Sequence, residues 1–294
     1  MSNTTMQNIT NKQATLLLAK LLYVVVFLAA ITTTHALAET SAGPKRYTFG
    51  IGPQQSAAES VRIWAPVLTY LSEKTGYVFD FATAKDSAIF VQRAAQGEYD
   101  FIYINPNSYA VLPSSASGYK AFAKERDTKL KGIIVVRRDS SYQTLSDLKN
   151  TTLAFPSAAA FAATLIPLAH FAKEGIKVEA KFVSSHESVY LAIAKGIYPG
   201  GGGVIRTFDA LSPSTRDQLR ILWTSPGYAP HPFAAHSRVP NAVVEQVRDV
   251  LINMDKDPAA KPLLGQLAIK GMTVASDAEY DAIRALKLPI PAQP

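Results

Sequence analysis

The sequence predicts an α/β fold of two lobes, each a mainly parallel sheet flanked by helices. A β-α-β-α-β order of apolar strands and helices runs from residue 47 to residue 104, and a similar run begins at residue 132. Strands joined through helices pair in parallel, because a right-handed crossover returns the chain to the same sheet. Two such units in tandem indicate two lobes rather than one continuous sheet.

The first unit contains three expected strands, at residues 47–52, 78–81 and 99–104. Helices are expected between them at residues 57–74 and 87–96, where apolar residues recur at helical spacing and a glycine follows each segment. The buried face of the longer helix is expected to consist of Val61, Trp64, Leu68 and Leu71.

The second unit starts with a β-branched strand at residues 132–136. A strand at residues 152–155 leads into a long alanine-rich helix that begins near Ala158. A strand at residues 180–183 leads into another helix, and a glycine run at residues 200–203 enters a short strand. The run is either a flexible loop or a place where the backbone approaches a ligand closely.

The tail after a strand at residues 219–223 is expected to be purely helical, at residues 241–254, 258–268 and 278–286. Because such a tail has no sheet of its own, we expect it to pack back onto the first lobe. The chain then crosses between lobes near Gly132 and again near Gly227.

Two crossings between lobes make a hinge, and a hinge between two lobes creates a cleft that can close on a ligand. We therefore assign residues 39–133 and 225–294 to the first lobe and residues 134–224 to the second.

The N-terminus has the pattern of a signal peptide over residues 1–38. Two lysines precede an apolar run at residues 21–31, and Ala36 and Ala38 supply the small side chains that a signal peptidase requires. We expect cleavage after Ala38 and a periplasmic mature chain. The alternative is an uncleaved anchor, but the apolar stretch is shorter than the ~20 residues that span a bilayer.

The composition argues against several classes of site. The 294 residues include no cysteine, which excludes disulfides and thiolate chemistry. The net charge of +7 is scattered rather than clustered, which argues against nucleic-acid binding and agrees with a preference for small anions.

We expect no cofactor and no metal, because Pro232 stops His231 and His236 from sharing a helix face. Nor do we expect an enzyme, since Ser157 lacks the glycine-flanked turn of a nucleophile.

The segment after the strand at residues 152–155 is a candidate anion site. A helix that begins near Ala158 would present unpaired backbone N–H groups and the positive end of its dipole, with Ser157 as its N-cap. Ala160 stands where a capping box would place an acid, so no side-chain anion competes for those donors. Such an arrangement suits a phosphate-like oxyanion. The alternative is an ordinary serine-capped helix.

Two motifs resemble the periplasmic phosphonate-, phosphite- and phosphate-binding proteins of ABC transporters, the PhnD-like solute-binding family. They are Gly-Pro-Gln-Gln-Ser at residues 52–56 and Gly-Glu-Tyr-Asp-Phe-Ile-Tyr-Ile-Asn-Pro at residues 97–106, and segments 131–137 and 183–189 extend the similarity. The resemblance covers residues 47 to about 286. It implies a two-lobed type II periplasmic-binding-protein fold, with an oxyanion held between the lobes by helix N-termini and hydroxyl groups.

The resemblance also implies the ligand contacts. Tyr103 corresponds to the aromatic residue at the end of the first lobe's third strand, and His186 to the histidine after the second lobe's middle strand. Family members that bind aminoethylphosphonate place acids where this chain has the glycines of residues 200–203, which argues against an amine-bearing ligand. The expected contacts are Gln54, Gln55, Ser56, Tyr103, Ser157, Ala158, Ala159, Ala160, His186 and Arg206.

Several of these contacts have structural alternatives. Ser56 forms a possible capping box with Glu59, and Ser184 forms one next to His186. Tyr103 is either a ligand contact or a core aromatic residue, and Arg206 either binds the anion or forms a surface salt bridge.

Two functions remain open. The first is a monomeric solute-binding protein that delivers a phosphonate, phosphite or phosphate to an ABC permease in the inner membrane. The second is a periplasmic ligand-sensing partner of a sensor kinase, which would use the same fold.

Overall fold

The computed structural model describes residues 43–112 and 118–290. The predicted signal peptide lies outside the described residues. From Arg46 onward the chain forms one compact unit. None of the helices in the described ranges is both long enough and apolar enough to cross a membrane.

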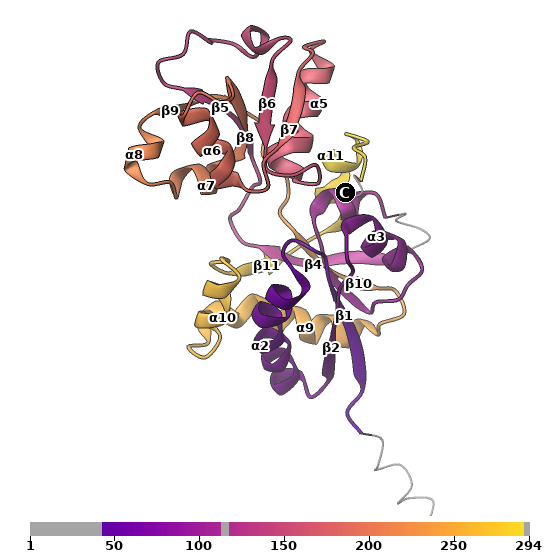
Figure 1. Ribbon diagram of the computed structural model, residues 1–294. Coiled ribbons are helices and arrows are strands. Elements are labelled where there is room, and N and C mark those ends of the chain that lie inside the picture. Colours follow the sequence, from indigo (N-terminus) through magenta and orange to yellow (C-terminus); the bar gives the residue numbers. More distant parts are fainter. Residues whose placement is uncertain (1–42, 113–117, 291–294) are drawn as a thin grey trace, which may run out of the picture. The chain divides into compact units, whose positions relative to one another are not determined.

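The first sheet has six strands in the order β11-β4-β10-β3-β1-β2 (Figure 1). The strand β1 pairs in parallel with β2 and β3, whereas β10 lies antiparallel between β3 and β4, and β11 is antiparallel to β4. Their bounds are β1 (Arg46–Ile51), β2 (Val78–Ala82), β3 (Phe101–Tyr103), β4 (Tyr119–Glu125), β10 (Pro232–His236) and β11 (Met272–Val274).

Helices cover both faces of the first sheet. On one face, α2 (Ala57–Thr75) and α9 (Asn241–Asn253) pack against each other and share a core with the large rings of β1 and β3. On the other face, α3 (Ser87–Ala95), α4 (Pro106–Ala110) and α11 (Asp281–Arg284) share a second core. Shorter elements are η3 (Met254–Lys256), α10 (Lys261–Gln266) and η4 (Asp277–Tyr280).

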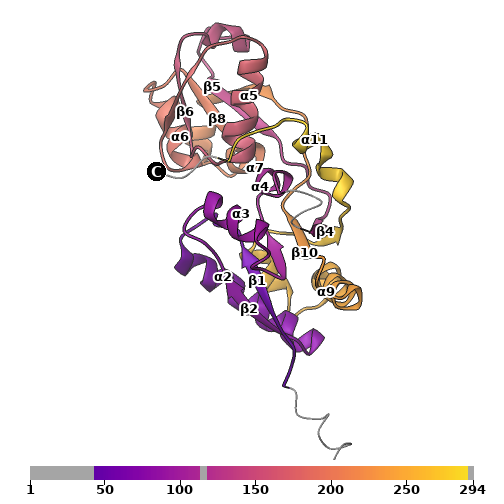
Figure 2. The same ribbon diagram turned by 90° about the vertical axis from the view of Figure 1, so that its right-hand side faces the viewer.

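The second sheet has five strands in the order β7-β6-β8-β5-β9. They are β5 (Gly132–Arg137), β6 (Thr152–Phe155), β7 (Glu179–Phe182), β8 (Gly200–Val204) and β9 (Leu219–Thr224). This sheet lies between α5 (Ile166–Lys173) and α6 (His186–Ala194), and Figure 2 shows one helix on either side of it. The remaining elements are η1 (Leu145–Leu148), η2 (Phe161–Leu165), α7 (Ile205–Asp209) and α8 (Pro213–Arg216).

The predicted tandem α/β architecture is confirmed, but both sheets are mixed rather than mainly parallel. Three of the five pairings in the first sheet and two of the four in the second are antiparallel. The chain passes between the sheets twice, from β4 to β5 and from β9 to β10. No crossover helix precedes these strands within a sheet, so nothing requires them to pair in parallel. An antiparallel bridge between Leu130 and Tyr228 joins these passages, near the predicted Gly132 and Gly227. The exact lobe boundaries stay a prediction.

The tail is not purely helical, and this expectation was wrong. Its strands β10 and β11 complete the first sheet, so the tail does pack onto that sheet as predicted. The predicted buried face of α2 was wrong at one of its four positions. Val61 on α2 is 43% exposed, whereas Trp64, Leu68 and Leu71 are buried, because the face centres on Ile63 and Val67.

The glycine run at residues 200–203 is neither a flexible loop nor an approach path for a ligand. It forms β8 itself, between β6 and β5 in the second sheet. A Cβ added at Gly202 would lie 1.9 Å from the carbonyl oxygen of Ala163, and one added at Gly203 would lie 2.1 Å from the hydroxyl of Tyr190. The close approach that the glycines permit is therefore made by the protein's own backbone and by a tyrosine.

Candidate ligand-binding site

The expected ligand contacts lie at the carboxyl ends of parallel strands in both sheets. Residues 52–56 follow β1 and Tyr103 ends β3, whereas residues 157–160 follow β6, His186 follows β7, and Arg206 follows β8. Open α/β sheets bind ligands at this edge, where loops and helix N-termini gather. Every predicted contact thus occupies a position from which an α/β protein can hold a small molecule.

Gln54, Gln55 and Tyr103 share a small cavity of about 50 Å³. Trp64 forms part of its wall, and Gln266 at the end of α10 contributes another part. The volume is several times the ~10–15 Å³ that one water molecule needs. The structure therefore brings three of the predicted residues together around a space suited to a small polar group.

Tyr103 belongs to an aromatic wall. Its ring centroid lies 4.7 Å from those of Trp64 and Phe233, and 5.5 Å from that of His231, whose ring is stacked at 21°. Burial raises the pKa of the Tyr103 phenol, so this hydroxyl remains a donor at neutral pH. Burial, and then the charge of Arg206, lowers the pKa of His231 to about 4. At neutral pH the wall thus offers an uncharged imidazole and a protonated phenol.

Arg206 supplies the positive charge of the site. Its Nη1 donates to the carbonyl oxygen of Ala268 at 3.4 Å, and Ala268 follows directly on the part of α10 that lines the cavity. The charge of Arg206 also helps to lower the pKa of His186 and of His231. At Tyr103 it opposes part of the rise in pKa that burial causes. No carboxylate among the described residues forms an ion pair with Arg206, so the surface-salt-bridge alternative does not hold there.

His186 is the first residue of α6. The helix is capped by Ser185, whose hydroxyl accepts from the backbone N–H of Ser188 at 3.0 Å, and not by Ser184, which has a left-handed backbone (φ 73°). Burial, and then the charge of Arg206, lowers the pKa of His186, so the imidazole is neutral at pH 7. Its Nδ1 is buried and has no hydrogen-bond partner in the described part of the chain. A buried polar atom without a partner is costly, and a ligand could satisfy it.

The helix after β6 begins later than predicted. Residues 158–159 form a turn, η2 is one π-helical segment starting at Phe161, and α5 continues it. Ser157 is therefore not an N-cap. Its carbonyl oxygen accepts from the hydroxyl of Thr164 at 2.8 Å and from the backbone N–H of Ala160 at 3.3 Å. The helix starts later because η2 lies tightly against β8. A regular α-helix would place different carbonyl groups over the glycines of β8.

This shift changes what the segment can offer a ligand. The Ser157 hydroxyl is free of the capping role, whereas the N–H of Ala160 already has a partner. Single π-turns inside helices are frequent at functional sites. No hydrogen bond or ion pair within the described ranges joins residues 157–160 to Tyr103 or Arg206.

Ser56 is a helix cap in this structure. Its hydroxyl accepts from the backbone N–H of Glu59 at 3.2 Å, which fits half of the predicted capping box. The Glu59 carboxylate does not complete the box, because it pairs with Arg62 at 2.5 Å. Ser56 thus stabilises α2, and its role as a ligand contact stays a prediction.

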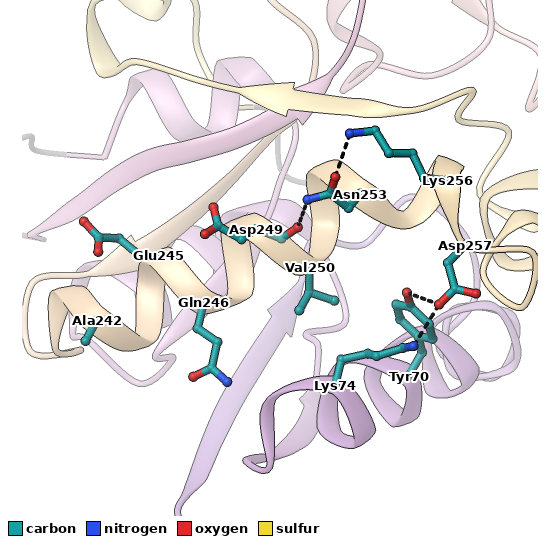
Figure 3. A pocket seen from close by; sticks show the side chains of 10 residues that line it. All are labelled: Tyr70, Lys74, Ala242, Glu245, Gln246, Asp249, Val250, Asn253, Lys256 and Asp257. Atoms are coloured by element: carbon teal, nitrogen blue, oxygen red, sulfur yellow. Dashed lines mark hydrogen bonds and ion pairs between the residues drawn. The ribbon is translucent and has the colours of Figure 1, made fainter.

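A larger cavity of about 720 Å³ lies between α2 and α9 (Figure 3), and none of the predicted contacts lines it. Its lining includes Glu245, Asp249 and Asp257. Lys74 is neutralised by Asp257 at 2.9 Å, and the Tyr70 hydroxyl donates to the same carboxylate at 2.9 Å. An anion would meet net negative charge here, so size alone does not make this the oxyanion site.

The described residues contain no group of three or more His, Asp or Glu side chains arranged to hold a metal ion. The sequence pattern suggests His231 only as a candidate metal ligand, because it does not predict β10. Once β10 pairs antiparallel with β3, Phe233 lies opposite Tyr103 and His231 falls beside the same ring. A strand after Pro-His-Pro was the signal that could have placed it.

Comparison with known proteins identifies the family. A family model described as "ABC transporter, phosphonate, periplasmic substrate-binding protein" matches residues 49–280. The chain belongs to this family. It is also 22% identical over 273 residues to the phosphonates-binding periplasmic protein of Escherichia coli (strain K12), with 88% of this chain and 81% of that protein covered. Members of this family bind substrates for ABC transporters, which agrees with the expectation that the chain is not an enzyme.

Solved structures share the fold. PhnD1 from Prochlorococcus marinus (MIT 9301), in complex with methylphosphonate, has a TM-score of 0.68 at 17% identity, with 83% of this chain and 97% of that chain covered. A binding protein component of an ABC phosphonate transporter from Pseudomonas aeruginosa has a TM-score of 0.64 at 20% identity, with 83% and 86% covered. A Xanthomonas citri protein bound to ATP has a TM-score of 0.70 at 17% identity, with 82% and 96% covered. At these identities the likeness supports the fold, a two-lobed type II periplasmic binding protein.

Proposed function

We propose that the mature chain, released after Ala38, is a monomeric periplasmic protein that captures a phosphonate-like oxyanion and delivers it to an ABC permease. Family membership supports the transport role. The names of the relatives support the ligand class, since the E. coli protein is called phosphonates-binding and the P. marinus protein was solved with methylphosphonate.

The observation that carries the ligand proposal is the set of donors around Arg206. The charge of this exposed guanidinium contributes to the low pKa values of His186 and His231 and acts on the phenol of Tyr103, whose ring stacks on that of His231 with centroids 5.5 Å apart. Guanidinium groups bind phosphate-like anions through two parallel hydrogen bonds, and imidazole and phenol each donate one more. Ser157 is proposed to add a hydroxyl from the second sheet.

The binding free energy of a micromolar ligand requires several such donors. A Kd of about 1 µM corresponds to about −8.2 kcal/mol. One helix N-terminus contributes only ~0.3–1 kcal/mol when exposed and up to ~2 kcal/mol when partly buried. Charge-assisted hydrogen bonds, at ~1.5–3 kcal/mol each, must therefore provide most of the affinity.

Titration calorimetry of the mature protein with methylphosphonate tests this proposal. We expect Ser157→Ala and His186→Ala each to weaken binding at least about tenfold, which is the loss of one charge-assisted hydrogen bond. The melting temperature without ligand should hardly change, because Ser157 caps no helix. Unchanged affinity in both variants would place the anion elsewhere.

Two serine variants serve as controls. Ser214→Ala changes an exposed serine on α8 and should leave both affinity and stability unchanged. Ser185→Ala removes the cap of α6 and should cost about 1 kcal/mol of stability. If Ser157→Ala lowers stability as Ser185→Ala does, its role is structural.

A further inference from the structure

A buried hydroxyl group lies directly behind the candidate anion segment, residues 157–160. It belongs to Thr164 on η2, which is fully buried. Its Oγ1 donates to the carbonyl oxygen of Ser157 at 2.8 Å, and its backbone N–H donates to the carbonyl oxygen of Ala160 at 2.9 Å. Two hydrogen bonds from one residue thus hold the first and the last residue of the segment.

The helical segment η2 gives Thr164 a fixed position. It packs against β5 and β8, where glycines let its backbone come close to the strands. A Cβ added at Gly202 of β8 would lie 1.9 Å from the carbonyl oxygen of Ala163, the residue before Thr164. Interiors packed this closely leave little room for a shift. The sheet therefore sets the position of the Ser157 carbonyl group through Thr164.

The direction of this carbonyl group fixes the direction of the next backbone donor. The peptide bond between Ser157 and Ala158 is trans, so its C=O and N–H groups point in opposite directions within one plane. Because the C=O group points at the buried Thr164 hydroxyl, the N–H of Ala158 points away from it. Neither Ala158 nor Ala159 donates a backbone hydrogen bond within residues 43–112 and 118–290. Successive N–H groups of a turn can bind an anion together.

We infer that Thr164 is a positioning residue of the anion site. Its hydroxyl holds the peptide between Ser157 and Ala158 so that an N–H group, and not a carbonyl oxygen, faces the ligand. Without this bond the Ser157 carbonyl keeps only the longer one from the N–H of Ala160, at 3.3 Å. A peptide that rotates would present the negative end of its dipole to an oxyanion, so a donor fixed in advance favours binding. The inference rests on the proposed function and adds a residue that itself touches no ligand.

Titration calorimetry of Thr164→Val with methylphosphonate tests the inference, because valine keeps the shape of the side chain and removes the donor. We expect binding at least about tenfold weaker, the loss of one hydrogen bond to a charged group. Thr164→Ser restores the hydroxyl and should recover most of the affinity. If Thr164→Val binds like the wild type, or Thr164→Ser binds as weakly as Thr164→Val, the hydroxyl does not position the site and the inference fails.

Thr151→Val is the matched control. The Thr151 hydroxyl also donates to a backbone carbonyl oxygen, that of Leu148, at 2.7 Å, but it lies before β6 rather than behind residues 157–160. This variant should leave the affinity for methylphosphonate unchanged. An equal loss of affinity in Thr151→Val and Thr164→Val would mean that general loosening of the second sheet weakens binding, which also overturns the inference.

The amide of Ala158 tests the same point in the unmodified protein, where no variant has to fold. With isotope labels that select Ser–Ala peptide bonds, methylphosphonate should move the Ala158 amide proton downfield in NMR spectra, as expected for an N–H that donates to an anion. This shift should be absent in Thr164→Val. An unperturbed Ala158 amide in a protein that binds methylphosphonate would overturn the inference and leave the proposed function intact. A protein that does not bind methylphosphonate refutes both.

Ala158→Pro shows whether Thr164 acts through this one donor. Proline is favoured at the second position of a turn and has no N–H group, so the variant removes the donor and suits the turn. It should weaken binding by itself, and Thr164→Val should then cost little further affinity, because the group that Thr164 positions is already gone. A full additional loss in the double variant would show that Thr164 acts elsewhere, and the inference fails.

Discussion

The two sheets are packed by opposite means. The first sheet buries large rings against α2 and α9. The ring of Phe49, for example, lies with its centroid 5.6 to 6.4 Å from those of Phe79, Phe101 and Phe233. The second sheet brings helix backbone down onto strand backbone, through glycines in β5 and β8. A Cβ at Gly132 would lie 2.0 Å from the carbonyl oxygen of Ala162.

This difference predicts opposite sensitivities to mutation. A core of interlocking rings loses stability when a ring is removed, because the cavity does not collapse. A backbone-to-backbone contact loses stability when a side chain is added, because there is no rotamer that avoids the clash. The interlocking rings of the first sheet should thus be most sensitive to large-to-small changes, and the glycines of β5 and β8 in the second to small-to-large changes.

The largest effect is expected from Phe101→Ala in the first sheet. Phe101 is fully buried and contacts the rings of Tyr47, Phe49 and Phe122. The substitution should destabilise the protein by about 3–5 kcal/mol in chemical denaturation. Phe182→Ala, at a site that is 45% exposed, is the matched control and should cost far less. Equal losses at the two positions would contradict the account of the first core.

The converse experiment is Gly202→Ala in the second sheet. The added methyl group would lie 1.9 Å from the carbonyl oxygen of Ala163 and 2.5 Å from the ring of Phe155, so backbone has to move. We expect a loss of about 3 kcal/mol, the upper end for overpacking. Gly265→Ala in α10 has open space and should be neutral or stabilise by about 0.5–1 kcal/mol. A Gly202 variant as stable as the wild type would show that η2 does not rest on β8.

The contrast also explains what could be predicted from the sequence. Strand and helix order follows from local periodicity, and most elements up to β9 lie close to the predicted ranges. The start of the helix after β6 does not, because it is set by contact with glycines about forty residues later in the chain. The segment from Ser157 to Ala160 reads locally as a capped helix, and only that tertiary contact changes it.

The candidate site was predictable in part for the same reason. Tyr103, His186 and Arg206 lie at or just after the ends of strands that could be recognised locally, and the charge of Arg206 acts on Tyr103 and His186. His231 depends on β10, which pairs with β3 more than a hundred residues earlier in the chain. Long-range antiparallel pairing leaves little local signal when the strand is as short as Pro232–His236.

The smallest effect that we predict compares one histidine from each region. Burial lowers the pKa of His231 to about 4, in the aromatic wall beside Tyr103, and it lowers that of His186, at the start of α6. Both side chains should therefore titrate below the ordinary histidine value of about 6.5 in proton NMR. A normal pKa at His231 would mean that the wall does not exclude water.

The shift at His231 makes a prediction about stability whose sign follows from proton binding. Between pH 4 and 6.5 the unfolded chain binds a proton at His231 that the folded chain does not bind, so protonation favours unfolding. Stability should rise with pH through this window and gain nothing more from His231 above it. We expect a contribution of about 2 kcal/mol, which is less than the full difference between the two pKa values would give, because His231 is only partly buried.

His231→Gln isolates this contribution from the carboxylates that also titrate in acid. The free energy of unfolding of the variant should depend less steeply on pH between 4 and 6.5 than that of the wild type, while the two curves run parallel above pH 6.5. His236→Gln is the matched control, because burial and then Arg238 lower the pKa of His236 as well, but the charge of Asp100 opposes them, so we expect this variant to flatten the curve less. If both variants flatten the curve equally, burial in the aromatic wall beside Tyr103 does not set the protonation of His231.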